Sequence, residues 1–223
     1  MGYIHGVTRK AKLYKVLLAK LIANREEGLP VSMLKHSLED TSVIDWLLEH
    51  GCLKLVDGKV KISSVAQLVL NMGRLGLNLH EASWWLTWKE FEMLASSILV
   101  ENNLNTNPNF IFTHQGKRYQ VDIVAWEGNS VYLIDCKQWF SSGVHGLRRA
   151  VEKQKERAAV LSKIYPGNEL KLYPLILTVQ HVNVINGVPI LSLDMLIRFD
   201  AHEFSDYFHF YVGKRLINCL KNG

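Results

Sequence analysis

Two aspartates and a lysine interrupt the apolar pattern between residues 119 and 139. Asp122 lies inside one apolar run, and Asp135 and Lys137 lie on either side of Cys136 in the next. The alternation in both runs predicts β-strands, in which side chains two residues apart share a face. Asp135 and Lys137 are therefore expected side by side.

The turn between the two runs decides whether Asp122 joins this pair. The segment Glu127-Gly128-Asn129 is typical of a hairpin turn. A four-residue loop over residues 127–130 would pair Trp126 with Val131. Counting back along both strands then places Asp122 opposite Asp135, on the face of the lysine. A slip of one residue would turn Asp122 to the other face, so the prediction depends on the loop length.

Two adjacent carboxylates on a half-buried sheet repel each other unless a cation compensates them. Hard oxygen ligands at this density favour Mg²⁺ or Mn²⁺, which also bind substrate phosphates. Lys137 would then orient or help deprotonate a water while the ion stabilises charge on the phosphate, which favours phosphodiester hydrolysis. The alternative is that Asp135 and Lys137 form an ordinary surface ion pair and that Asp122 is a solvated strand residue.

The segment "VDIVAWEGNSVYLIDCKQW" resembles the core of the PD-(D/E)xK nuclease superfamily, in particular its archaeal Holliday-junction-resolvase-like and Mrr-like restriction endonuclease branches. The resemblance covers about residues 85–200. It implies that Asp122 and Asp135 hold the metal, that the backbone carbonyl of Cys136 is a further ligand, and that Lys137 is the motif lysine. Val121 stands where the motif has proline.

The helix "EFEMLASSIL" resembles the first helix of the same superfamily and implies one more carboxylate at the site. Glu92 matches best and Glu90 is the alternative. Only one of them can face the sheet, because they lie about 200° apart on a helix.

An amphipathic helix is expected after the lysine, from Gly143 to Ile164. The resemblance implies a glutamine of this helix near the site, for which Gln154 is the candidate and Gln138 the alternative. Its cations, including Arg148 and Arg149, either contact a phosphate backbone or form a solvated face.

Three helices followed by two short strands are expected in the N-terminal third. Pro30 is expected in the first turn of the second helix, and Asp57-Gly58 predicts a tight hairpin turn. The order resembles the winged-helix domains of prokaryotic DNA-binding proteins. Basic residues of the hairpin favour nucleic-acid contact, whereas acidic residues on the third helix oppose it, so DNA and protein partners both remain open. The basic residues are Lys54, Lys59 and Lys61.

The composition favours a globular chain. Of 223 residues, 48% are hydrophobic and 21% are charged, which excludes disorder. The formal net charge is +5, of which residues 1–80 contribute +4. Three scattered cysteines form no CxxC pair, which favours a reducing cytoplasm. Neither a leader nor an apolar run of about 18 residues is found, so we expect no membrane association. Phosphate-loop, serine-hydrolase and zincin motifs are absent.

Together these features predict an α/β fold, with a restriction-endonuclease-like mixed sheet flanked by helices over residues 81–223 and a winged helix-turn-helix domain over residues 1–80. The expected function is a Mg²⁺-dependent DNA endonuclease; the alternative is a non-catalytic DNA- or protein-binding factor on an inactive nuclease scaffold. The substrate stays open among duplex, junction, flap, modified site and RNA. Aromatic residues near the C-terminus recur at helical spacing and predict a helix whose aromatic face packs in the core; the alternative is a homodimer interface. The aromatic residues are Phe204, Tyr207, Phe208 and Tyr211.

Overall fold

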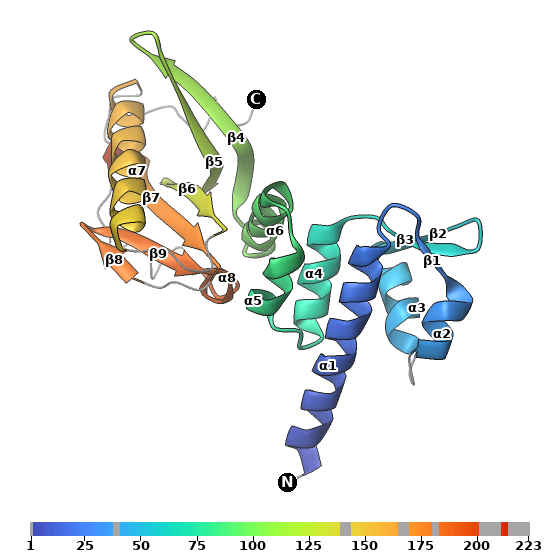
Figure 1. Ribbon diagram of the computed structural model, residues 1–223. Helices are drawn as coiled ribbons and strands as arrows, with labels where there is room; N and C mark the ends of the chain where they lie inside the picture. Colours follow the sequence, from blue (N-terminus) through green and yellow to red (C-terminus); the bar gives the residue numbers. More distant parts are fainter. Residues whose placement is uncertain are drawn as a thin grey trace. The chain divides into compact units, whose positions relative to one another are not determined.

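The computed structural model describes residues 2–37, 41–138, 144–164, 170–179, 183–200 and 211–213 (Figure 1). The chain divides into two compact units, Met1–Leu94 and Ala95–Gly223. Helix α6 (Trp88–Glu101) runs across the division. Within the described ranges, none of the helices combines the length and apolar character that a membrane crossing requires.

The first unit is helical, with one small antiparallel sheet in the order β1-β3-β2. The hairpin predicted at Asp57-Gly58 is confirmed, and both turn residues have positive φ, 50° and 73°, as a tight two-residue turn requires. The elements are α1 (Gly2–Ala23), β1 (Leu29–Pro30), α2 (Val31–Ser37), α3 (Ser42–Glu49), β2 (Leu53–Val56), β3 (Lys59–Ile62), α4 (Val65–Arg74), α5 (Leu79–Ala82) and the 3-10 turn η1 (Ser83–Trp85).

The prediction for Pro30 is wrong. Pro30 lies in β1, opposite Lys59, and the helix begins one residue later at Val31. Gly28, with a φ of 77°, redirects the chain so that Leu29 pairs with Val60. An edge strand tolerates proline because the missing N–H is not needed on the open side.

The second unit is an α/β fold built on a mixed sheet in the order β4-β5-β6-β7-β9-β8, with β10 paired to β7. Strands β4, β5 and β6 form an antiparallel meander, and β6, β7 and β9 are parallel. The predicted fold class is confirmed. The elements are β4 (Asn105–His114), β5 (Lys117–Glu127), β6 (Ser130–Lys137), α7 (Val144–Ile164), β7 (Leu170–Thr178), β8 (Asn183–Ile185), β9 (Val188–Ser192), α8 (Leu193–Leu196) and β10 (Tyr211–Gly213).

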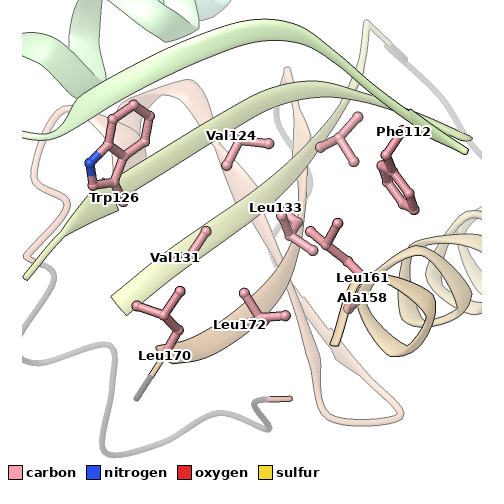
Figure 2. Packing of buried hydrophobic residues seen from close by; sticks show 10 residues of the cluster. Phe112, Val124, Trp126, Val131, Leu133, Ala158, Leu161, Leu170 and Leu172 are labelled. Atoms are coloured by element: carbon pink, nitrogen blue, oxygen red, sulfur yellow. The ribbon is translucent and has the colours of Figure 1, made fainter. Parts of the chain in front are cut away.

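Helix α7 covers one face of this sheet. Figure 2 shows Ala158 and Leu161 of α7 packed with Val124, Leu133 and Leu172 from three adjacent strands. Each fully buried aliphatic side chain of this kind contributes about 1.5–3 kcal/mol to stability. The packing fixes which side chains of α7 face the sheet, and therefore which polar groups can reach the strands.

Two further segments differ from what their sequences favour. The asparagines and the proline of residues 102–108 favour a loop, but the segment is strand from Asn105 onward. Tyr211, predicted on a helix, belongs to β10 and lies opposite Leu172 of β7. The other aromatic residues of that prediction, Phe204, Tyr207 and Phe208, lie outside the described residues.

Candidate active site

The register of β5 and β6 is the one predicted. Trp126 lies opposite Val131, and the paired positions continue to Ile123 opposite Ile134. The loop itself is shorter than predicted, because Glu127 and Ser130 also pair and leave a two-residue turn. The register is unchanged, since an added pair at the turn does not shift the strands.

Asp122 lies where the regular ladder of β5 ends. The next position along β6 is Asp135, beyond the last pair Ile123–Ile134. One carboxylate oxygen of Asp122, Oδ2, accepts a hydrogen bond of 2.8 Å from the backbone N–H of Cys136. The side chain thus receives a donor from β6 at the point where the two backbones separate, and this places its carboxylate directly beside the Asp135-Cys136-Lys137 segment.

Asp135 is almost fully buried, at 2% exposure, and two cations contact it. The Lys137 ammonium lies 2.7 Å from Oδ2, and the Arg157 guanidinium lies 2.7 Å from Oδ1. A buried carboxylate needs such partners because desolvation disfavours its charge. The predicted neighbourhood of Asp135 and Lys137 is confirmed; the aspartate of this ion pair is buried, whereas the side chain of Lys137 keeps 19% of its surface exposed.

Gln154 links helix α7 to the same carboxylate. Its side chain is fully buried and its Nε2 donates to the carbonyl oxygen of Leu133, at 2.5 Å. Its Oε1 accepts a hydrogen bond of 2.8 Å from Nη1 of Arg157, the nitrogen that also donates to Asp135. A chain of hydrogen bonds therefore runs from the backbone of β6 through Gln154 and Arg157 to Asp135.

The sequence analysis missed Arg157 as a site residue. It treated the cations of this helix as one group, although only those facing the sheet can reach the strands. The available signal was spacing: residues three apart on a helix share a face, so Arg157 had to accompany Gln154.

The predicted helix carboxylates are engaged in α6. Glu90 accepts hydrogen bonds from the backbone N–H and hydroxyl of Thr87, at 2.7 and 2.9 Å, which is a capping-box arrangement at the start of the helix. The Glu92 carboxylate accepts from Nε1 of Trp88. Glu92 belongs to the first unit and the two aspartates to the second. The role of Glu92, and its preference over Glu90, stay predictions.

The predicted nucleic-acid contacts lie on both units. Arg148 and Arg149 are exposed on α7. In the first unit, Lys54 lies directly opposite Lys61 in the β2–β3 hairpin, and Lys59, two positions from Lys61 in β3, is on the same face. Like charges directly opposite each other repel, so the pair favours an anion nearby. Lys61 also donates a 3.3 Å hydrogen bond to the carbonyl oxygen of Glu26. The role of these residues stays a prediction.

Asp122, Asp135 and the carbonyl group of Cys136 present oxygen atoms, the kind of ligand through which Mg²⁺ binds proteins, with one or two carboxylates, waters and substrate phosphates. No group of three or more histidine, cysteine, aspartate and glutamate side chains suited to a metal occurs among the described residues. The Lys137 ammonium contacts two of the same oxygens, Asp135 Oδ2 and Cys136 O, the latter at 3.3 Å.

Compared with protein-family models and with curated proteins, the sequence matches none. Among solved structures it is similar to R.BspD6I2, the small subunit of the heterodimeric restriction endonuclease R.BspD6I, with 14% identity and a TM-score of 0.41 over 63% of this chain and 85% of that one. Can2 from Sulfobacillus thermosulfidooxidans, solved in complex with cyclic tetra-adenylate, has 13% sequence identity and a TM-score of 0.39, over 89% of this chain and 53% of Can2. Protein VC1899 from Vibrio cholerae has 12% sequence identity and a TM-score of 0.39, over 90% of this chain and 52% of VC1899.

The chain thus spans about half the length of Can2 and of VC1899. At TM-scores below 0.5 these similarities carry no argument about function.

Proposed function

We propose that this protein is a Mg²⁺-dependent endonuclease that hydrolyses phosphodiester bonds in DNA. The observation that carries the proposal is the group formed by the buried Asp122 and Asp135 and the partly exposed Lys137, in which the Asp122 carboxylate accepts a hydrogen bond from the backbone amide between the other two residues. Metal-assisted phosphodiester hydrolysis requires oxygen ligands that bind a divalent ion and a group that orients the attacking water. The two carboxylates would supply the first and the lysine the second.

Each residue has a distinct role in this proposal. Asp122 and Asp135 would hold the ion, together with the carbonyl oxygen of Cys136. A bound Mg²⁺ would supply positive charge to the phosphate oxygens. The Lys137 ammonium orients the attacking water, and its positive charge favours loss of the water's proton to solvent. Gln154 and Arg157 keep Asp135 in place from α7.

A second candidate, a binding factor without catalysis, has one observation in its favour. The charges of Asp122 and Asp135 are matched by those of Lys137 and Arg157, so the buried group is formally neutral with its own side chains. The hairpin lysines of the first unit would then make the nucleic-acid contacts of a winged-helix module. Titration with Mn²⁺ separates the candidates, because only the nuclease needs to bind the ion.

The test is a cleavage panel with the purified full chain and with Mg²⁺ or Mn²⁺. The substrates are supercoiled plasmid, linear duplex, branched junction, flap, modified duplex and single-stranded RNA. We expect nicking or cutting of at least one DNA substrate, and none by Asp122→Asn or Lys137→Ala. Asp194→Asn and Lys163→Ala, which change exposed residues of α8 and α7, are matched controls and should cut normally. Equal cutting by Asp122→Asn and the wild-type chain would contradict the proposal.

A further inference from the structure

Strands β4 and β5 continue beyond the rest of the sheet as a two-stranded ribbon. Strand β6 pairs with β5 only from Ile123 to Glu127, whereas β4 pairs with β5 as far as His114 opposite Lys117. Figure 1 shows this ribbon, residues 110–121, running past the end of β6 to its turn. At about 3.3 Å per residue, each of its strands is on the order of 15 Å long.

One face of the ribbon is fixed to the body of the second unit. Phe112 and Val121 belong to the core cluster under α7. At the tip, Lys117 lies 2.6 Å from Glu156 of α7, and the hydroxyl of Tyr119 donates to the same carboxylate. The hydrogen bond between them raises the pKa of Lys117 and lowers that of Glu156, so both stay charged at neutral pH. The ribbon is therefore held at both ends of this face.

The opposite face is exposed and polar. Thr113, Arg118 and Gln120 are exposed there, together with Ile111. No acidic residue occurs from Asn102 to Val121, although the whole chain holds 21. Exposed amide side chains on or next to the ribbon are those of Asn109, Gln115 and Gln120. A surface with amides and without carboxylates suits a polyanion that offers hydrogen-bonding edges.

This face leads directly to Asp122. The ladder pairs Pro108–Ile123 and Phe110–Val121 place Asn109 opposite Asp122. Asn109 has a φ of 55°, unusual within a strand, and its Oδ1 accepts a hydrogen bond of 3.4 Å from Nε2 of Gln120. Left-handed backbone at a non-glycine position costs free energy and is concentrated at functional sites.

The side chains of β5 change from one face of the sheet to the other near Asp122. Val121 and Val124 both join the cluster under α7, although residues three apart in a regular strand lie on opposite faces. The ribbon therefore turns over at Asn109 and Asp122. Asp122 stands at the junction, with the exposed row of Asn109, Gln120 and Arg118 on one side and the buried site on the other.

We propose that the exposed face of the β4–β5 ribbon lies in the major groove of duplex DNA and positions the strand that reaches Asp122. Arg118 contacts a phosphate, and the amides of Gln120 and Asn109 contact base edges or sugar-phosphate groups beside the cut. The major groove of B-form DNA, about 12 Å wide, admits a two-stranded ribbon and presents edges that amides can read. The major groove of A-form RNA is too narrow for this. This inference rests on the proposed function for its choice of nucleic acid.

Binding is measured by fluorescence anisotropy with a labelled 30-base-pair DNA duplex and the full chain carrying Asp122→Asn, which keeps the duplex intact. In that background Arg118→Ala should weaken binding about 3- to 10-fold. The slope of log K against log [salt] should fall by about one, which corresponds to the loss of one phosphate contact. Arg118→Lys should restore most of the affinity. The pair Asn109→Gly with Gln120→Ala removes both amides while glycine keeps the backbone conformation; it should weaken binding by a similar factor with an unchanged salt slope. Arg198→Ala and Asn183→Ala, on other exposed segments, are the controls.

Affinities of all ribbon variants within twofold of the parent, or no binding of the duplex by the parent, would overturn the inference. Equal affinity for an A-form RNA duplex, with the same losses, would overturn the assignment to the DNA major groove. Cleavage by chains with intact Asp122 tells the two proposals apart. If ribbon variants cut DNA with unchanged KM, the nuclease proposal stands and the ribbon inference fails. If they bind DNA less well and no chain cuts any substrate, the ribbon inference stands and the nuclease proposal fails.

Discussion

The link between Arg157 and Asp135 gives the sharpest prediction about this site. Replacing Arg157 with methionine keeps most of the side-chain volume and removes the guanidinium. Asp135, at 2% exposure, would retain only Lys137 as a cationic partner, and the buried Oε1 of Gln154 would lose its donor. Removing one partner of a fully buried ion pair costs about 3–5 kcal/mol.

Two features of the structure reduce this figure. The Arg157 side chain keeps 21% of its surface exposed, so water partly replaces the lost contact. Lys137 still contacts the other oxygen of the carboxylate. A charge-assisted hydrogen bond is worth about 1.5–3 kcal/mol, and we expect Arg157→Met to lower the free energy of unfolding of the second unit by about 2–3 kcal/mol.

A double-mutant cycle isolates the contact itself. Asp135→Asn with Arg157→Met should be less destabilised than the sum of the two single variants, by about 1–2 kcal/mol. The assay is urea unfolding followed by hydrogen–deuterium exchange of peptides from β6 and α7, which reports on the second unit separately from the first. Lys153→Met, an exposed neighbour on α7, should change stability by less than about 0.5 kcal/mol. Strict additivity, or a loss for Arg157→Met no larger than that for Lys153→Met, would refute the reasoning.

Three further predictions concern other parts of the second unit. Lys137→Met should abolish cleavage yet tighten Mn²⁺ binding, by about tenfold in isothermal titration calorimetry, because the ammonium competes for Asp135 Oδ2 and Cys136 O; weaker binding would contradict this. Asn109→Ala should lower stability by about 1 kcal/mol and Asn109→Gly should not, since the φ of 55° is costly for a side chain other than asparagine; equal melting temperatures would count against it. Burial raises the pKa of Tyr132 to about 12. Its contribution to stability is therefore present below about pH 10 and lost as the pH rises through 12. Tyr132→Phe should remove that part of the alkaline loss in urea titrations, and an unchanged alkaline profile would refute it.

The contact between Asp135 and Lys137, and the register of β5 against β6, could be predicted because strand geometry is local. A period of two fixes which side chains share a face, and a hairpin turn fixes the register of its strands. The predicted loop length was wrong, but the predicted register is correct. One additional residue pair at the base of the loop shortens the loop and shifts neither strand.

Other features depend on contacts that no local pattern encodes. Arg157 reaches Asp135 only because α7 packs across β6 with Ala158 and Leu161 facing the core. The switch of face at Asn109 and Asp122 breaks the alternation from which strands are predicted, and the sequence shows no glycine there to reveal it. Pro30 belongs to a strand because Leu29 pairs with Val60 and Pro30 with Lys59, and no local sequence pattern shows this pairing. Local rules alone therefore predicted a helical position for Pro30.

The most direct test of metal binding at this site is a crystal of the full chain soaked in Mn²⁺ and measured at the manganese absorption edge. We expect an anomalous peak within coordination distance of the carboxylates of both Asp122 and Asp135, and its loss in Asp122→Asn. Manganese bound only elsewhere, or no peak at millimolar Mn²⁺ with these side chains ordered, would contradict it.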